Sequence, residues 1–157
     1  MTLFRESSDI NMPDPIIRKL IASDTENVAF IEEQCFAEPW SASSVLMLTQ
    51  ANAFGTVCEA DGTLAAYGGM ICVLDEGQIT NIATLPDFRH RGLAKKVLLA
   101  MLDEARERKL SFVTLEVRES NAAAIALYEQ LGFVRLGKRP NFYRKPTEAA
   151  VIMEKKL

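Results

Sequence analysis

"ITNIATLPDFRHRGLAKKVLLAML", residues 79–102, joins a strand pattern to a helix pattern through a basic turn that contains a glycine. The first part, 79–85, is an apolar run that favours a strand. From Leu93 to about Lys109 the apolar side chains recur every three or four positions, which predicts an amphipathic helix. The turn "RHRGLA" at 89–94 therefore connects a strand to a helix.

This turn has the features of an anion-binding helix start. Gly92 permits close approach to the backbone, and Ala94 adds almost no bulk. A helix that begins here directs unpaired N–H groups and a partial positive charge outward. We interpret the turn as a phosphate cradle that matches neither the P-loop nor the dinucleotide fingerprint. The alternative is a surface loop whose arginines are simply solvated.

The remaining patterns alternate between strands and helices. Strands are predicted at 15–21, 54–60, 63–74, 112–117, 133–137 and 149–157, and helices at 23–36, 41–50 and 121–132. Ser23 with Glu26 predicts a capping box, Ser41 an N-cap, and Asp61-Gly62 a hairpin. This order indicates an α/β protein with a mixed sheet and helices on both faces. We expect one domain at 15–157 after a flexible leader at 1–14.

The composition is that of an ordinary globular protein. The chain has 157 residues, of which 48% are hydrophobic, and a net charge of −3, which gives no global attraction to nucleic acid. The longest apolar stretch, "VLLAML", is far too short to span a membrane, and no signal peptide is evident. We therefore expect a cytoplasmic protein that binds neither nucleic acid nor membranes.

The thiols and imidazoles argue against a metal site. Cys35, Cys58 and Cys72 form no C-x-x-C pair, and His90 is the single histidine. We expect reduced cysteines and no metal.

Several motifs together resemble the GNAT acetyltransferase superfamily. "RHRGLA" fits its Arg/Gln-x-x-Gly-x-Gly/Ala signature, and it lies after a strand and before a helix. "LDEGQITNIATLPDFRHRGLAKKVL", "LEVRESNAAAIALYEQLGF" and "EAAVIM" closely resemble the RimI type of protein N-terminal acetyltransferase. The resemblance runs from about Ile17 to Met153.

This resemblance implies a fold and a cofactor site. The sheet would be mostly antiparallel and splayed at its middle, with acetyl-CoA inserted in the opening. The backbone of Ile82, Ala83 and Thr84 would contact the acetyl carbonyl and the pantetheine arm, and Asn121 would contact the cofactor further along. The diphosphate would lie on the turn formed by His90, Arg91, Gly92, Leu93, Ala94 and Lys95.

The resemblance also assigns the proton transfers, with Glu116 as the base, through water, and Tyr128 as the acid. Strand alternation places Glu116 on the face opposite its apolar neighbours, and Asn121 and Tyr128 share one helix face. By spacing alone, Glu116 could be a solvated strand residue and Tyr128 a surface residue of an amphipathic helix. Asn121 could cap its helix, which is compatible with a cofactor contact.

Acceptor contacts are implied at "CFAEPWS" and "RPNFYRKP", which resemble the two segments that shape the family's acceptor groove. Trp40 and Tyr143 are the candidate contacts, although Trp40 could instead be a core anchor. The segment "YRKPTEAAVIM" is shorter than the family loop, so the acceptor is less defined than the reaction.

The expected activity is acetyl transfer from acetyl-CoA to the N-terminal α-amino group of a protein, and the family precedent is the N-terminal alanine of a small-subunit ribosomal protein. The alternatives are a small-molecule amine or lysine as acceptor, or a non-catalytic acyl-CoA sensor. We expect a monomer or weak dimer.

Overall fold

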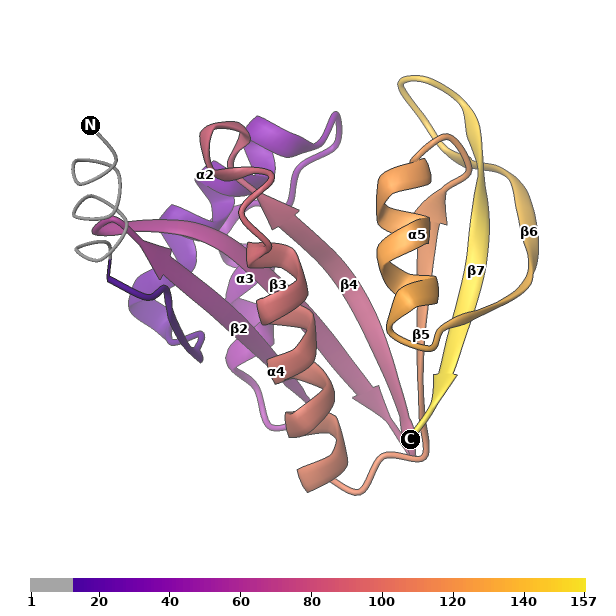
Figure 1. The fold of residues 1–157 in the computed structure, drawn as a ribbon, viewed down its shortest axis with the longest axis horizontal. Helices are drawn as coiled ribbons and strands as arrows, with labels where there is room; N and C mark the ends of the chain where they lie inside the picture. Colours follow the sequence, from indigo (N-terminus) through magenta and orange to yellow (C-terminus); the bar gives the residue numbers. More distant parts are fainter. Residues whose placement is uncertain (1–12) are drawn as a thin grey trace, which may run out of the picture.

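The computed structural model describes residues 13–157 and is built on a seven-stranded sheet (Figure 1). The strands are β1 Ile16–Lys19, β2 Ala53–Ala60, β3 Thr63–Val73, β4 Glu76–Thr84, β5 Phe112–Arg118, β6 Val134–Tyr143 and β7 Glu148–Lys156. Their order is β1-β2-β3-β4-β5-β7-β6, and only β4 and β5 pair in parallel. The predicted mixed, mostly antiparallel sheet is confirmed. Residues 1–12 of the predicted leader lie outside the described residues.

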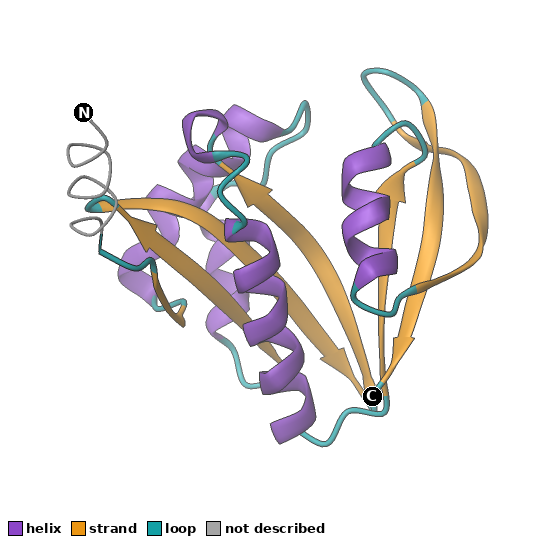
Figure 2. Ribbon diagram, viewed as in Figure 1, coloured by secondary structure: helices purple, strands orange, loops and turns teal. Residues whose placement is uncertain are grey.

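Helices cover both faces of the sheet (Figure 2). They are α2 Thr25–Cys35, α3 Ala42–Leu46, α4 Leu93–Glu107 and α5 Ala122–Gln130, with short 3₁₀ turns η1 Ala22–Asp24, η2 Met47–Thr49 and η3 Pro86–Phe88. One buried cluster packs α4 and α5 against the sheet, and it includes Ala66 of β3. The other packs α2 and α3, and it includes the next residue, Tyr67. Because neighbouring strand residues point to opposite faces, these clusters lie on opposite sides of the sheet.

The sheet opens between β4 and β5, which diverge in Figure 1 from the end near the C-terminus. The two strands share only three pairs, the last of them Gln78 with Thr114. Immediately beyond, β4 carries a bulge, since Gly68 pairs with Ile82 while Met70 pairs with Ile79. A bulge bends its strand and increases the local twist, which directs β4 away from β5.

Local sequence signals account for several boundaries. Asp61 and Gly62 have φ of 53° and 76°, as the predicted two-residue hairpin turn between β2 and β3 requires. The Ser41 hydroxyl accepts a hydrogen bond from the Ser44 N–H at 3.2 Å, so the predicted N-cap of α3 is confirmed. Gly132 lies just after α5 with φ of 96°, a left-handed conformation that ends helices and that glycine adopts without strain.

Three expectations were wrong. Ser23 and Glu26 form no capping box; α2 begins after η1, and Asp24 instead accepts the Ile21 N–H at 2.8 Å. Strand β4 begins at Glu76 rather than Ile79, because the hairpin from β3 turns within two residues. Strand β6 extends to Tyr143, so most of "RPNFYRKP" is strand, with a register shift, rather than loop.

In the described part of the chain, no helix is long and apolar enough to cross a membrane.

Candidate active site

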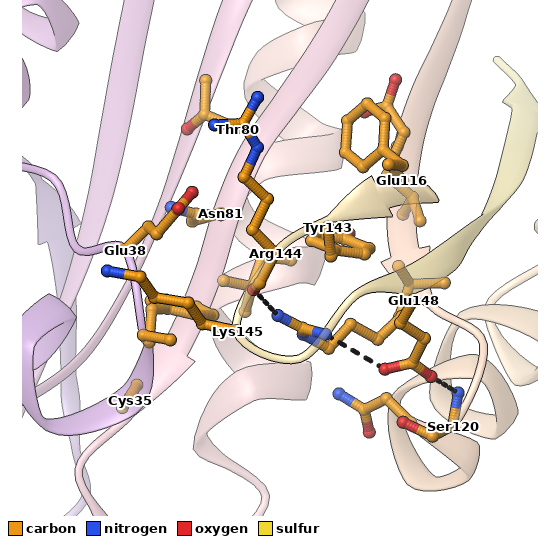
Figure 3. A pocket seen from close by; sticks show the side chains of 18 of the residues that line it. Cys35, Glu38, Thr80, Asn81, Glu116, Ser120, Tyr143, Arg144, Lys145 and Glu148 are labelled. Carbon is orange, nitrogen blue, oxygen red and sulfur yellow. Dashed lines mark hydrogen bonds and ion pairs between the residues drawn. The ribbon is translucent and has the colours of Figure 1, made fainter. Parts of the chain in front are cut away.

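A pocket of about 620 Å³ lies where β4 and β5 diverge (Figure 3). Its walls come from four parts of the chain: β4, β5 with α5, the end of α2 with the segment up to Trp40, and the segment 142–148, which runs from the end of β6 to the start of β7. In Figure 3, Thr80 and Asn81 face the pocket from β4 and Glu116 from β5, with Arg144 between them in this view. The opening of the sheet is therefore a pocket walled by side chains from several elements.

Six of the predicted site residues meet at this pocket. The lining includes Ile82, Glu116, Asn121, Tyr128, Trp40 and Tyr143. Ala83 does not line it, because its side chain is buried in the cluster under α2 and α3. Thr84 and the turn at 90–95 also lie outside the lining.

The backbone of Ile82 faces the opening. Leu85 donates its N–H to the Ala65 carbonyl of β3 at 2.8 Å, and backbone groups alternate between the two edges of a strand. The N–H and C=O groups of Ile82 and Thr84 therefore point to the edge of β4 that faces β5. Because the pairing with β5 ends at Gln78, the Ile82 N–H has no strand partner there. Such a fixed donor can polarise a carbonyl.

Tyr128 is buried on α5, with 8% of its surface exposed, and its ring packs 5.8 Å from that of Phe133. Burial, together with the nearby Tyr143, raises its pKa to about 12. The phenol is therefore protonated at neutral pH and can donate a proton. The alternative that Tyr128 is a surface residue was wrong.

Glu116 is exposed on β5, while Leu115 and Val117 on either side of it are buried, so the predicted alternation is confirmed. The pKa of Tyr143 is raised to about 12, first by the burial of its own ring and then by the nearby negative charge of Glu116. A carboxylate and a buried phenol thus line one pocket, which is the pair that general acid-base chemistry needs.

Arg118 braces the wall that carries Tyr143. Its guanidinium lies 4.5 Å from the centre of the Tyr143 ring and donates to the Arg144 carbonyl at 2.9 Å. It also pairs with Glu148 at 3.1 Å, and Glu148 accepts the Ser120 N–H at 2.6 Å. These bonds hold the turn between β6 and β7 against the start of α5.

The basic turn before α4 is braced rather than loosely solvated. Gly92 has φ of 74°, and α4 starts directly after it without a side-chain cap or a first-turn acid. Arg91 pairs with Asp61 at 2.8 Å, and Arg89 donates to the Thr84 carbonyl at 3.2 Å. The first N–H groups of α4 therefore remain available to an anion.

Asn121 caps α5, since its Oδ1 accepts the Ala124 N–H at 3.2 Å. The capping role is confirmed, and a cofactor contact stays a prediction. Among residues 13–157, no cluster of three or more His, Cys, Asp or Glu side chains is placed to hold a metal ion.

Sequence reasoning missed a buried polar group behind the pocket. Glu32 is fully buried, and its Oε1 accepts a hydrogen bond from Asn81 Nδ2 at 2.7 Å. One signal was present: Glu32 falls on the same helical stripe as Val28, Ile31 and Cys35. A charged residue on a buried stripe predicts a specific polar partner.

Comparison with known proteins identifies the family. Residues 23–133 match the model of the acetyltransferase (GNAT) family. The chain is 42% identical over 127 residues to ribosomal protein bS18-alanine N-acetyltransferase from Salmonella typhimurium, covering 78% of this chain and 84% of that protein. It is 38% identical over 141 residues to the Escherichia coli K12 protein of the same name, covering 87% and 94%.

A solved structure agrees with the fold. The crystal structure of the Escherichia coli ribosomal-protein alanine N-acetyltransferase superposes with a TM-score of 0.85 at 35% identity, covering 91% of this chain and 94% of that one. The chain belongs to the acetyltransferase (GNAT) family, whose members transfer an acetyl group from acetyl-CoA.

Proposed function

We propose that this protein acetylates the N-terminal α-amino group of a protein, and that its acceptor is the N-terminal alanine of the small-subunit ribosomal protein bS18. The observation that carries the proposal is that the Ile82 edge of β4, the Glu116 carboxylate and the buried Tyr128 phenol line one pocket together. The relatives named as bS18-alanine N-acetyltransferases support this choice of acceptor. A ribosomal acceptor also favours a cytoplasmic location.

Acetyl-CoA supplies an acetyl group activated as a thioester. The residues around the pocket suit it, because the Ile82 N–H can donate to the thioester oxygen and the free N–H groups at the start of α4 can hold the diphosphate. We assign the diphosphate to the turn from His90 to Lys95, and further cofactor contacts to Asn121 and the Thr84 N–H. The contact expected at Ala83 is not assigned, because the Ala83 N–H and C=O point toward β3, as those of Leu85 do.

The acceptor amine must lose a proton to react. An α-amino group has a reference pKa of about 8 and is mostly protonated at neutral pH, so a base must accept its proton. We assign this role to Glu116, acting through water. The amine nitrogen then attacks the carbonyl carbon, the C–S bond breaks, and Tyr128 donates its proton to the leaving sulfur.

We assign Trp40 and Tyr143 to the acceptor. They line the pocket from different segments, 35–40 and 142–148, so a peptide that enters between these segments would contact both. Trp40 also packs against the buried cluster under α2 and α3, so it serves as a core anchor as well. Both acceptor segments lie within residues 15–157, which we propose form a single catalytic domain.

The test is acetyl-CoA turnover, followed by mass spectrometry of the products, with short peptides that differ only in their first residue. We expect acetylation of the alanine-first peptide at its α-amino group, and none when that amine is already acetylated. Modification of a polyamine or a lysine side chain alone would contradict the proposal and favour the rival acceptors. Coenzyme A binding without turnover on any acceptor would favour a sensor.

A further inference from the structure

The fully buried Glu32 lies in the last turn of α2, directly behind the pocket but outside its lining. Its carboxyl group is removed from water, and burial raises its pKa. One oxygen, Oε2, makes no hydrogen bond of ordinary geometry with the described residues, although the buried Tyr67 phenol lies beside the carboxyl group. Burying such a group is costly unless hydrogen bonds replace its lost hydration.

The other oxygen joins two walls of the pocket. Oε1 of Glu32 accepts from Asn81 Nδ2 at 2.7 Å and from the Trp40 N–H at 3.4 Å. Asn81 belongs to β4, and Trp40 ends the segment 35–40 on the acceptor side. One buried oxygen therefore connects the strand that faces the thioester with the segment that faces the acceptor.

Asn81 is half of the bulge in β4. Thr80 and Asn81 lie between the pairs that Ile79 and Ile82 make with β3, opposite the single residue Gly69. A Cβ atom on Gly69 would approach Thr80 Oγ1 to 2.6 Å, so the bulge is packed without spare room. The next residue is Ile82, whose N–H the bulge directs toward the opening.

We propose that Glu32 is a positioning residue: by holding Asn81, it fixes the β4 bulge and thereby aims the Ile82 N–H at the thioester oxygen. The inference rests on the proposed function and deepens it. Because Glu32 does not line the pocket, it does not exchange protons with the substrates. To hold Asn81, Glu32 needs an oxygen that accepts a hydrogen bond, not a negative charge. A catalytic carboxylate would need its charge, so a neutral acceptor at this position distinguishes the two roles.

The decisive variants are Glu32→Ala, Asn81→Ala and Glu32→Gln. Both alanine variants should lower kcat by about ten to a hundredfold, because a small displacement of a catalytic donor is costly. Their affinity for coenzyme A should change less than about twofold, because the diphosphate lies at the start of α4. Glu32→Gln should retain most of kcat, since its amide oxygen can still accept from Asn81 and from the Trp40 N–H.

Asp24→Ala is the matched control, because Asp24 is also a buried carboxylate at α2 but bonds Arg18 and the Ile21 N–H instead. It should lower the melting temperature and leave kcat unchanged. A normal kcat in Glu32→Ala would overturn the inference. So would a Glu32→Gln variant as slow as Glu32→Ala, since that result would require the charge.

A second measurement needs no acceptor. In the free protein, the amide NMR signal of Ile82 should shift in Glu32→Ala and Asn81→Ala but stay in place in Asp24→Ala and Glu32→Gln. An unmoved Ile82 signal in both alanine variants would overturn the inference even if no peptide were acetylated. Failure of the wild type on every peptide, with the Ile82 signal shifted as expected, would instead contradict only the proposed function.

Discussion

The two walls of the pocket present different kinds of chemical group. The β4 wall offers main chain, the N–H of Ile82, at a bulge whose Asn81 is bonded to the buried Glu32. The wall built from β5 and α5 offers side chains, Glu116 and Tyr128. A main-chain wall depends on the shape of the backbone and tolerates many residues at the contact itself, whereas a side-chain wall fails when one functional group is removed.

The largest expected effect is on the side-chain wall. Tyr128→Phe should lower kcat by about 10² to 10⁴-fold, because the ring still packs but the proton donor is gone. Affinity for coenzyme A, measured by calorimetry, should stay nearly constant. Tyr143→Phe should lower kcat far less than Tyr128→Phe does, although the pKa of Tyr143 is also raised to about 12. The opposite ranking would move the acid role to Tyr143.

Glu116→Gln should reduce kcat by about a hundredfold, near the lower end for a general base, because a water molecule can still carry the proton away slowly. Steady-state kinetics with an alanine-first peptide would measure this loss. Glu119→Gln is the control, since Glu119 follows β5 but bonds Lys138 outside the pocket. An equal loss of kcat in both variants would mean that Glu116 does not act as the base.

Gly92→Val tests a third, main-chain site, the turn before α4. A Cβ atom added there meets no atom beyond its chain neighbours within 4 Å, yet the φ of 74° strains a branched residue. We expect coenzyme A to bind about tenfold more weakly, a loss of about 1.4 kcal/mol, because the side chain occupies space that the diphosphate needs. Calorimetry would measure the change.

Gly132→Val is matched to Gly92→Val for backbone strain, since Gly132 has φ of 96°. Among the described residues, a Cβ atom added there would approach only the flexible end of the Lys155 side chain. It should lower the melting temperature to a similar extent and leave the affinity for coenzyme A intact. Equal weakening in both variants would mean that strain, rather than the cradle, explains the effect.

The smallest expected effect is a level kcat/KM at high pH. kcat/KM should rise as the acceptor amine, with a pKa of about 8, loses its proton. It should then stay level to about pH 10, because Tyr128 acts while protonated and its pKa is raised to about 12. The pH profile of kcat/KM would check this. A fall well below pH 10 would contradict Tyr128 as the acid.

The difference between the walls also explains what the sequence could predict. The α4 stripe and the Asp61-Gly62 turn follow from local periodicity and turn chemistry, and the structure confirms both. Glu116 and Tyr128 could be named from the sequence because the residue type alone gives the functional group of a side chain. Their roles remain predictions.

The β4 wall is harder to read in the sequence. The bulge at Thr80 and Asn81 depends on long-range pairing with β3, and no local pattern marks it. Glu32 could have been noticed as a charge on an apolar stripe, but its partner lies 49 residues away. The length of β6 likewise depends on its partner β7, since nine of its ten residues are exposed and carry no burial pattern.

We expect one acetyl-CoA molecule to contact both walls and the turn before α4. A crystal structure of this protein with coenzyme A and an alanine-first peptide would test it most directly. We expect the sulfur within hydrogen-bond reach of the Tyr128 hydroxyl, the pantetheine arm beside Ile82, and the diphosphate on the N–H groups that follow Gly92. Coenzyme A bound away from the opening between β4 and β5 would rule out this cofactor site, and a sulfur far from Tyr128 would rule out Tyr128 as the acid.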